Sequence, residues 1–155
     1  MKAHKILVLS AVTLLSACSE KEPSRSGPQV VDFEVTPEAF RQAGKVYEKT
    51  LEENRSILNA DLRKALAFLD GKSYLDAMST AQVAAKNSAD VRVKGMANLI
   101  VARALSLDGK SGLAGVKYRR AFGILGMRVE PKTILLLSHV ADRDGIVSGR
   151  DGRGE

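Results

Sequence analysis

The sequence predicts an all-α domain of stacked antiparallel helical hairpins, and three observations point to it. Apolar residues recur every three to four positions from Phe40 onward, the spacing of helices that bury one face. Glycine and serine interrupt these segments where helices would end and begin. A five-residue sequence then occurs twice, each time at a junction between two expected helices. With 155 residues, 45% of them hydrophobic, the chain can bury one core and is too short for two ordinary domains.

Residues 1–17 are expected to be an export signal rather than part of the fold. Lys2 and Lys5 supply a positively charged start, and residues 6–15 form an apolar segment that is too short to span a bilayer. Two small residues then precede Cys18. This order of charge, apolar segment and small residues is typical of a cleaved signal peptide, and the alternative for Cys18 is an incidental cysteine after an ordinary secretory signal.

Leu15, Ser16, Ala17 and Cys18 together resemble the lipobox of bacterial lipoprotein precursors. The resemblance implies cleavage before Cys18, lipidation of its thiol and acylation of the new amino terminus, and two or three acyl chains would anchor the protein stably. Cys18 is the single cysteine of the chain, which excludes an internal disulfide framework and a cysteine-based metal cluster. Because Ser19 rather than an aspartate follows, the resemblance favours the periplasmic face of the outer membrane, or the outer face of a single membrane.

Two flexible segments are expected to flank the helical domain, which we place at residues 36–142. Residues 18–35 should form a tether, because two prolines and a glycine interrupt any periodic pattern there. Residues 143–155 should form a disordered tail, since their only large apolar residues are Ile146 and Val147.

The first helix is expected to start at Thr36 and to run to about Leu58. Thr36 can cap the helix, a proline follows at a position where its missing N–H costs nothing, and an acid occupies the first turn. Glu48 and Glu52 lie four residues apart and could form a catalytic or metal-binding pair. Interleaved lysines and arginines instead favour a solvated face of ion pairs.

Five further helices are expected. Ser73, Ser111 and the Glu130-Pro131 pair are plausible starts, and Gly71, Gly109 and Gly126 are plausible stops. The last helix is apolar nearly all round at residues 134–137, which fits a buried terminal helix or, alternatively, a short strand. The expected ranges are 60–69, 73–86, 90–107, 111–125 and 131–141.

An internal repeat supports stacked hairpins. Leu69-Asp70-Gly71-Lys72-Ser73 recurs as Leu107-Asp108-Gly109-Lys110-Ser111, from position 69 to position 107, a period of 38. Helical hairpins that repeat at such a period stack on one another. The alternative is a plain helical bundle that uses the same linker twice.

The segment from about residue 60 to 126 resembles the tetratricopeptide family. Tyr74-Leu75-Asp76-Ala77 is similar to that family's start of a second helix, and Ala77, Ala81 and Ala84 match its spacing of small residues. The repeat departs from the family in period, since 38 exceeds about 34. The family's large aromatic position is occupied by Ala81 in the first unit and, at this period, by Arg119 in the second. Gly115 replaces the first helix-packing alanine, and the closing proline is absent. The resemblance implies a groove for a peptide or for a partner's helix.

Motifs for nucleotide binding are incomplete. Gly-Lys-Ser occurs at 71–73 and at 109–111, as at the end of a phosphate-binding loop. Leu66 and Ala104 stand where that loop needs an earlier glycine, and both copies follow expected helices rather than strands. A nucleotide site is therefore not expected.

Catalytic and metal-binding constellations are not expected either. His139 is the single histidine left after processing, so it has no second imidazole or thiolate with which to complete a zinc site. The adjacent Ser138 is expected on a different face of the helix, and residues 145–149 do not have the spacing of a nucleophile elbow. Residues 142–145 lack the later ligands of a calcium loop. The sequence therefore predicts a non-enzymatic protein without a cofactor.

Positive charge is concentrated in the second repeat. The net charge of +6 falls to +4 without Lys2 and Lys5, and residues 91–135 hold nine basic and two acidic residues. The cluster consists of Lys110, Lys117, Arg119, Arg120, Arg128 and Lys132, with Tyr118 inside it. It is either a solvated face without a specific role or a docking surface for an anionic partner. Outside the cytoplasm we expect no nucleic acid; an acidic protein, an anionic lipid headgroup or a cell-wall polymer fits better.

The expected function is that of a membrane-anchored envelope lipoprotein that acts as a protein-binding scaffold or assembly factor. The candidate contact residues are Lys117, Tyr118, Arg119 and Arg120. The alternative is a structural envelope module that binds an anionic polymer or lipid headgroups through the basic face of residues 91–135.

Overall fold

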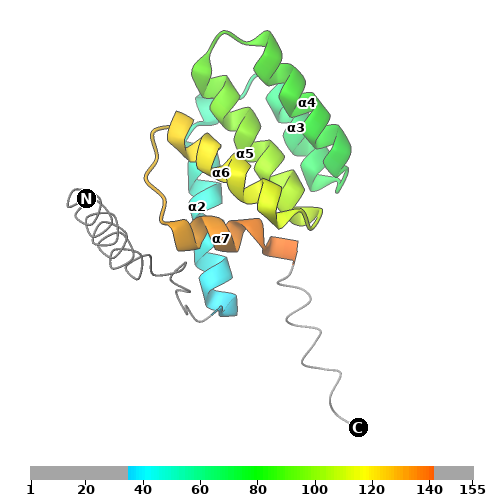
Figure 1. Ribbon diagram of the computed structural model, residues 1–155. Coiled ribbons are helices and arrows are strands. Elements are labelled where there is room, and N and C mark those ends of the chain that lie inside the picture. Colours follow the sequence, from blue (N-terminus) through cyan, green and yellow to red (C-terminus); the bar gives the residue numbers. More distant parts are fainter. Residues whose placement is uncertain (1–34, 142–155) are drawn as a thin grey trace, which may run out of the picture. The chain divides into compact units, whose positions relative to one another are not determined.

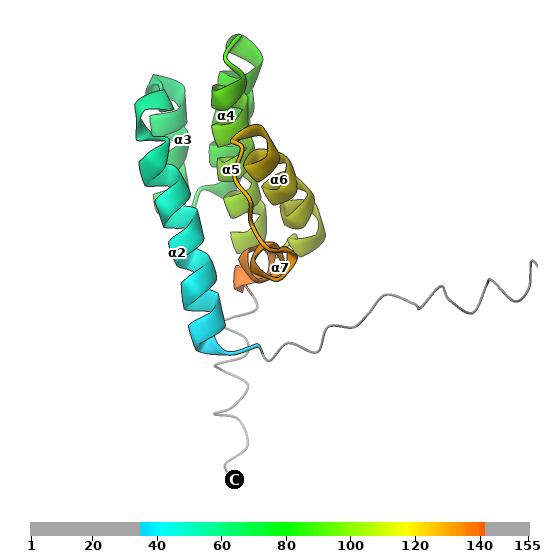
Figure 2. The same cartoon turned by 90° about the vertical axis from the view of Figure 1, so that its left-hand side faces the viewer.

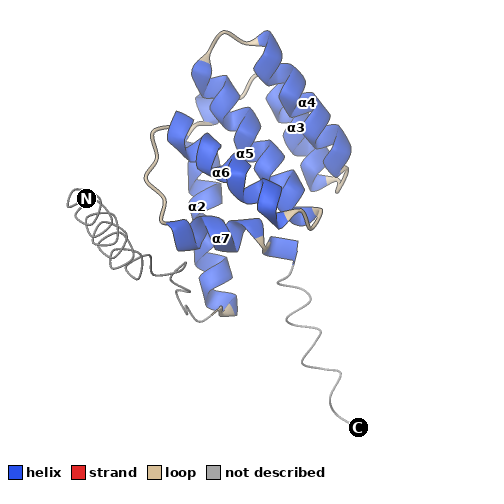
Figure 3. Ribbon diagram, in the orientation of Figure 1, coloured by secondary structure: helices blue, strands red, loops and turns tan. Residues whose placement is uncertain are grey.

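The computed structural model describes residues 35–141, and within this range the secondary structure is helical, without strands (Figure 3). The expectation of an all-α fold is confirmed for these residues. The elements are α2 (Pro37–Glu53), the short 3-10 helix η2 (Arg55–Ile57), α3 (Ala60–Asp70), α4 (Tyr74–Asn87), α5 (Val91–Leu107), α6 (Ser111–Ile124) and α7 (Pro131–Ser138). The signal residues Leu15, Ser16 and Ala17, the lipidation residue Cys18, the tether up to residue 34 and the tail lie outside the described residues.

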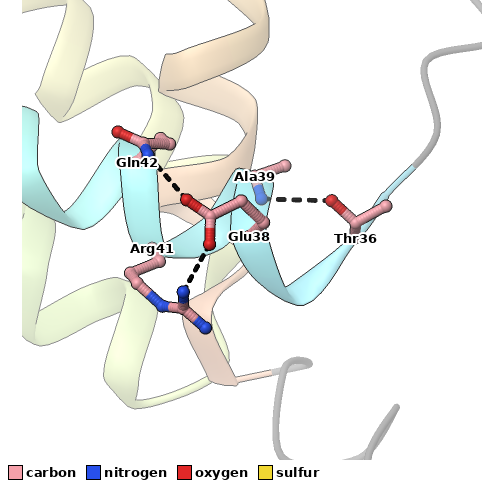
Figure 4. A network of polar contacts seen from close by, with 5 residues as sticks. All are labelled: Thr36, Glu38, Ala39, Arg41 and Gln42. Carbon is pink, nitrogen blue, oxygen red and sulfur yellow. Dashed lines mark hydrogen bonds and ion pairs between the residues drawn. The ribbon is translucent and has the colours of Figure 1, made fainter.

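Helix α2 begins at the residues that the sequence indicated. The hydroxyl oxygen of Thr36 accepts a hydrogen bond from the N–H of Ala39 (3.1 Å), which satisfies one of the free donors at a helix start. The carboxylate of Glu38 accepts a hydrogen bond from the Gln42 side chain (2.6 Å) and pairs with Arg41 (Figure 4). These contacts fix the residue at which the helical domain starts.

Helix α2 ends at Glu53, earlier than the expected Leu58. The buried side chain of Asn54 donates to the carbonyl oxygen of Thr50 (2.9 Å) and accepts a hydrogen bond from the Arg92 guanidinium (3.3 Å). Because Arg92 lies in the first turn of α5, this link ties the end of α2 to the start of α5. The chain then turns through η2 into α3.

The four central helices form two antiparallel hairpins, α3 with α4 and α5 with α6, and each helix packs against the next along the chain (Figures 1 and 2). Helix α5 is the centre of the core, since eleven of its seventeen residues are buried. Gly95 allows its close approach to the end of α6, because a Cβ there would lie 2.9 Å from side-chain carbons of Ile124 and Leu125. Helices α2 and α7, the first and last described, pack against each other.

The buried positions of the two hairpins repeat at a period of 37, one less than the period of the five-residue sequence. From position 62 to position 99, and at four further pairs, residues that are at most 1% exposed recur at this interval. The pairs are Leu62 and Leu99, Ala65 and Ala102, Ala77 and Ala114, Ala81 and Tyr118, and Ala84 and Ala121. At this period Ala114 and Tyr118, rather than Gly115 and Arg119, are the equivalents of Ala77 and Ala81.

The difference of one residue between the two periods arises in the turns, which share one backbone conformation at a period of 37, while the five-residue sequence is displaced by one residue within it. In the second turn Gly109 has φ +76°, and the N–H of Lys110 donates to the carbonyl of Leu105 (2.8 Å). In the first turn φ of Gly71 is −76°, and Lys72 takes the left-handed conformation instead, with φ +62°. Helix α3 thus runs one residue further into the shared sequence than α5 does, which accounts for the period of 37.

Candidate functional site: a basic groove between α4 and α6

A groove of about 210 Å³ lies between α4 and α6, with α5 as its floor. Ala85, Ala97 and Val101 supply small, apolar lining. Because these side chains are short, they leave the space between α4 and α6 unfilled. The amide side chains of Gln82 and Asn98 line it as well. Three cations complete the lining, Lys94 from α5 and Lys117 and Arg120 from α6. We refer to these eight residues as the basic groove.

The charge of the basic groove is not compensated by neighbouring carboxylates. None of its lining residues is acidic. The ion pairs of the described residues involve Arg41, Lys49, Arg55, Lys110 and Lys132, and none of them involves Lys94, Lys117 or Arg120. Lys117 is half-buried, whereas Lys94 and Arg120 are exposed. The groove therefore presents three cations to a ligand that enters it.

The basic cluster that the sequence indicated is divided by the structure. Lys117 and Arg120 lie in the basic groove, while Arg119 and Arg128 line a different hollow. Lys110 pairs with Asp108 (2.7 Å) and Lys132 pairs with Glu130 (3.0 Å), so these two lysines have local partners.

Tyr118 does not belong to this surface, and its expected role in partner binding is wrong. Its side chain is completely buried, and its ring stacks on that of Phe122 with centroids 6.0 Å apart. A residue on a helix is rotated by about 100° from its neighbour, so Tyr118 faces the core while the cations on either side of it do not. The groove includes Lys94 in its place, a residue that the sequence cluster had left out.

The second hollow, of about 520 Å³, lies between the end of α6 and the start of α7. It is lined mainly by apolar residues and by Arg119, Arg128 and Glu130. Because Glu130 carries the opposite charge, this hollow is less basic than the groove. We call it the α6–α7 hollow.

A buried polar cluster joins α2, α5 and α6. The Arg103 guanidinium lies 5.0 Å from the ring centroid of Tyr47. Neither the Tyr47 nor the Tyr118 hydroxyl has a hydrogen-bond partner in the described part of the chain, although Ser106 and Arg103 approach that of Tyr118. Burial raises the pKa of both tyrosines, and the charge of Arg103 opposes the rise. Sequence reasoning missed this cluster, because its members lie far apart along the chain.

The remaining candidate residues have structural positions. Asp70 ends α3, and Gly71, Lys72 and Ser73 form the first turn. Asp108, Gly109 and Lys110 form the second turn, and Ser111 begins α6. The N–H of His139 donates to the carbonyls of Leu135 and Leu136 at the end of α7. Glu52 pairs with Arg55 (3.4 Å), as expected for an ion-pair face.

Residues 35–141 contain no group of three histidine, cysteine, aspartate or glutamate side chains that could hold a metal ion. None of the helices described here has both the length and the apolar character that crossing a membrane requires. No protein-family model matches the chain, and no curated protein or solved structure is significantly similar to it.

Proposed function

We propose that the chain is a lipid-anchored envelope protein whose helical domain holds an anionic protein partner in the basic groove, as a scaffold or assembly factor. The anchor rests on the lipobox sequence that ends at Cys18, with the periplasmic face of the outer membrane as the proposed site. The scaffold role rests on the stacked hairpins and on the groove between them. Within this proposal the protein is not an enzyme.

The observation that carries the binding role is the convergence of Lys94, Lys117 and Arg120 on one groove without a carboxylate among the lining residues. Three neighbouring cations repel one another, which raises the electrostatic energy of the empty groove. An anionic group that enters the groove would relieve this repulsion and would meet fixed helices rather than mobile loops. Such complementarity raises the rate of association and selects the partner.

The period of 37 supports the resemblance to tetratricopeptide repeats. With Ala114, Tyr118 and Ala121 as the equivalents of Ala77, Ala81 and Ala84, the second unit has a large aromatic residue between two packing alanines. We propose on this basis that the domain is a two-hairpin member of that architectural type, with α7 covering the second hairpin.

A second candidate function is the binding of an anionic cell-wall polymer or of lipid headgroups. It is favoured by the excess of nine basic over two acidic residues in 91–135, which extends beyond the groove to Arg119 and Arg128. In that case Arg119→Glu would weaken binding as much as Arg120→Glu. For a partner that is held in the basic groove, Arg120→Glu alone should have a large effect.

The proposed function is tested by crosslinking in membranes, followed by affinity capture. The wild-type protein should retain one acidic partner, and Lys117→Glu with Arg120→Glu should lose it. Lys45→Glu, which reverses an exposed cation on α2, is the matched control and should retain it. Retention by the groove variant would contradict the assignment of the site.

The anchor is tested separately by fatty-acid labelling and fractionation of the wild type and of Cys18→Ala. We expect label and membrane association in the wild type and neither in the variant. A labelled, membrane-bound Cys18→Ala protein would overturn the anchor and the compartment inferred from it.

A further inference from the structure

The walls of the basic groove continue toward the hairpin turns as stripes that carry exposed leucines. On α6, Leu113 precedes Lys117 by four residues and Arg120 by seven, so the three side chains lie on one stripe of the helix. On α4, Leu75 precedes Gln82 by seven residues and lies on the stripe that forms the opposite wall. The groove thus has a basic end and, nearer the turns, an apolar end.

Leu75 and Leu113 are the two most exposed large apolar side chains of the described residues, at 72% and 61%. A single exposed leucine is ordinary on a protein surface. Here one leucine stands on the continuation of each wall of the groove, Leu75 on α4 and Leu113 on α6. Both are available for burial by a ligand that already contacts the cations.

We infer that the partner held in this groove is an acidic peptide segment with a large apolar side chain beyond its carboxylates. The carboxylates pair with Lys94, Lys117 and Arg120, and the apolar side chain covers Leu75 and Leu113. This inference rests on the proposed function and adds the chemistry of the segment that is recognised.

The spacing of that segment follows from helix geometry. Seven residues of α6 separate Leu113 from Arg120, which is a rise of about 10 Å along the helix axis. An extended peptide covers this distance in about three residues. The recognised segment therefore has acidic residues at one end and a leucine or a residue of similar size about three positions away.

A membrane surface fits this arrangement less well than a peptide does. In a bilayer the charged headgroups and the apolar chains are layered one below the other in depth. In the groove the basic and apolar ends lie one after the other along the helices, at one surface. Lys117 is also half-buried and lines the groove, so a ligand must enter a recess to reach it.

The test uses the purified full chain and two synthetic peptides of equal length and charge. Both carry adjacent glutamates, and three positions further one has leucine and the other serine. We expect the leucine peptide to bind about tenfold more tightly, because one buried leucine contributes about this factor. Vesicles of phosphatidylglycerol and phosphatidylcholine are the third probe.

Two double variants separate the two ends of the groove. Lys117→Glu with Arg120→Glu should weaken both peptides, whereas Leu75→Ser with Leu113→Ser should abolish only the preference for leucine. Lys45→Glu and Leu135→Ser change an exposed cation and a partly exposed leucine outside the groove and should leave both affinities unchanged. Circular dichroism of each variant verifies that it remains folded.

The outcomes distinguish the inference from the proposed function. If the wild type binds both peptides equally and the charge variant binds neither, the apolar end is refuted while the basic groove stands. If the charge variant binds as the wild type does, the basic groove itself is refuted. Binding to the anionic vesicles in the absence of peptide binding would overturn the peptide in favour of a lipid surface.

Discussion

The guanidinium of Arg103 lies over the ring of Tyr47, 5.0 Å from its centroid, and so joins α5 to α2. Arg103 is half-buried, and no carboxylate of the described residues pairs with it. A cation that is held over an aromatic face in a partly desolvated position stabilises a protein by about 1 to 2 kcal/mol. This contact therefore contributes to the attachment of the first helix to the centre of the core.

Replacement of Arg103 by methionine should reduce the free energy of unfolding by about 1 kcal/mol, because it keeps the aliphatic stem and removes the charge. Urea unfolding measures the change. Arg63→Met, at an exposed position on α3, is the control and should have little effect. Equal stability of both variants would show that the charge of Arg103 contributes nothing.

Tyr47→Phe should leave the stability unchanged or raise it by about 1 kcal/mol. The hydroxyl that is removed is buried without a partner among the described residues. Its desolvation therefore lowers the stability of the folded protein, and no hydrogen bond offsets this loss. Tyr47→Ala should instead reduce the stability by roughly 3 kcal/mol or more, because it leaves a cavity. A clear loss in the phenylalanine variant would reveal a hydrogen-bond partner such as a bound water.

The stability should decline above about pH 10. Burial raises the pKa of Tyr47 and Tyr118 in the folded protein, whereas a tyrosine of the unfolded chain ionises near its ordinary value of 10.0. Above that pH the unfolded chain gives up protons that the folded protein retains, and the equilibrium moves toward unfolding. Below about pH 10 both tyrosines are protonated in the folded and the unfolded chain, so the stability does not depend on their ionisation.

Tyrosinate absorbance measured along a pH series of urea unfolding curves tests this expectation. Tyr47→Phe with Tyr118→Phe should flatten the decline of stability above pH 10. An unchanged decline in the double variant would assign it to other groups.

The two copies of the repeated turn provide a matched pair of glycine substitutions. Gly109→Ala should reduce the stability by about 1 kcal/mol, because its φ of +76° places an alanine in the left-handed region. Gly71→Ala should be neutral or slightly stabilising, since its φ is −76° and a Cβ there would lie no closer than 3.4 Å to its neighbours, an ordinary contact distance. Thermal unfolding of both variants checks this difference, and equal losses would contradict it.

Lys72→Gly should raise the stability by a few tenths to about 1 kcal/mol. Lys72 holds a φ of +62°, which costs a residue with a Cβ more than it costs glycine. Thermal unfolding of the Lys72→Gly variant and of the wild type measures this change. A loss of stability would show that the lysine side chain contributes more than its backbone conformation costs.

The helices could be predicted from the sequence because their starts and stops are local. Thr36 caps α2 as its side chain suggests, and α5 ends at Leu107 as expected. The end of α2 was placed too late, since Asn54 is fixed by a contact with Arg92, a residue 38 positions away. A long-range contact of this kind leaves no periodic pattern near the helix end.

The candidate site could be predicted only in part. The identical five-residue sequence indicates a period of 38. The apolar spacing of Ala114, Tyr118, Ala121 and Phe122 instead marks a core-facing stripe that corresponds to a period of 37. That pattern could have excluded Tyr118 from the surface. The groove could not have been found in this way, because it depends on how far α4 and α6 stand apart over α5.

The contact between α2 and α7 has a consequence for when the domain can fold. The two central hairpins are made from neighbours along the chain, so they can form while later residues are still being synthesised. Helix α2 cannot complete its packing until α7, the last helix, has arrived. Until then the part of the buried face of α2 that packs against α7 stays uncovered.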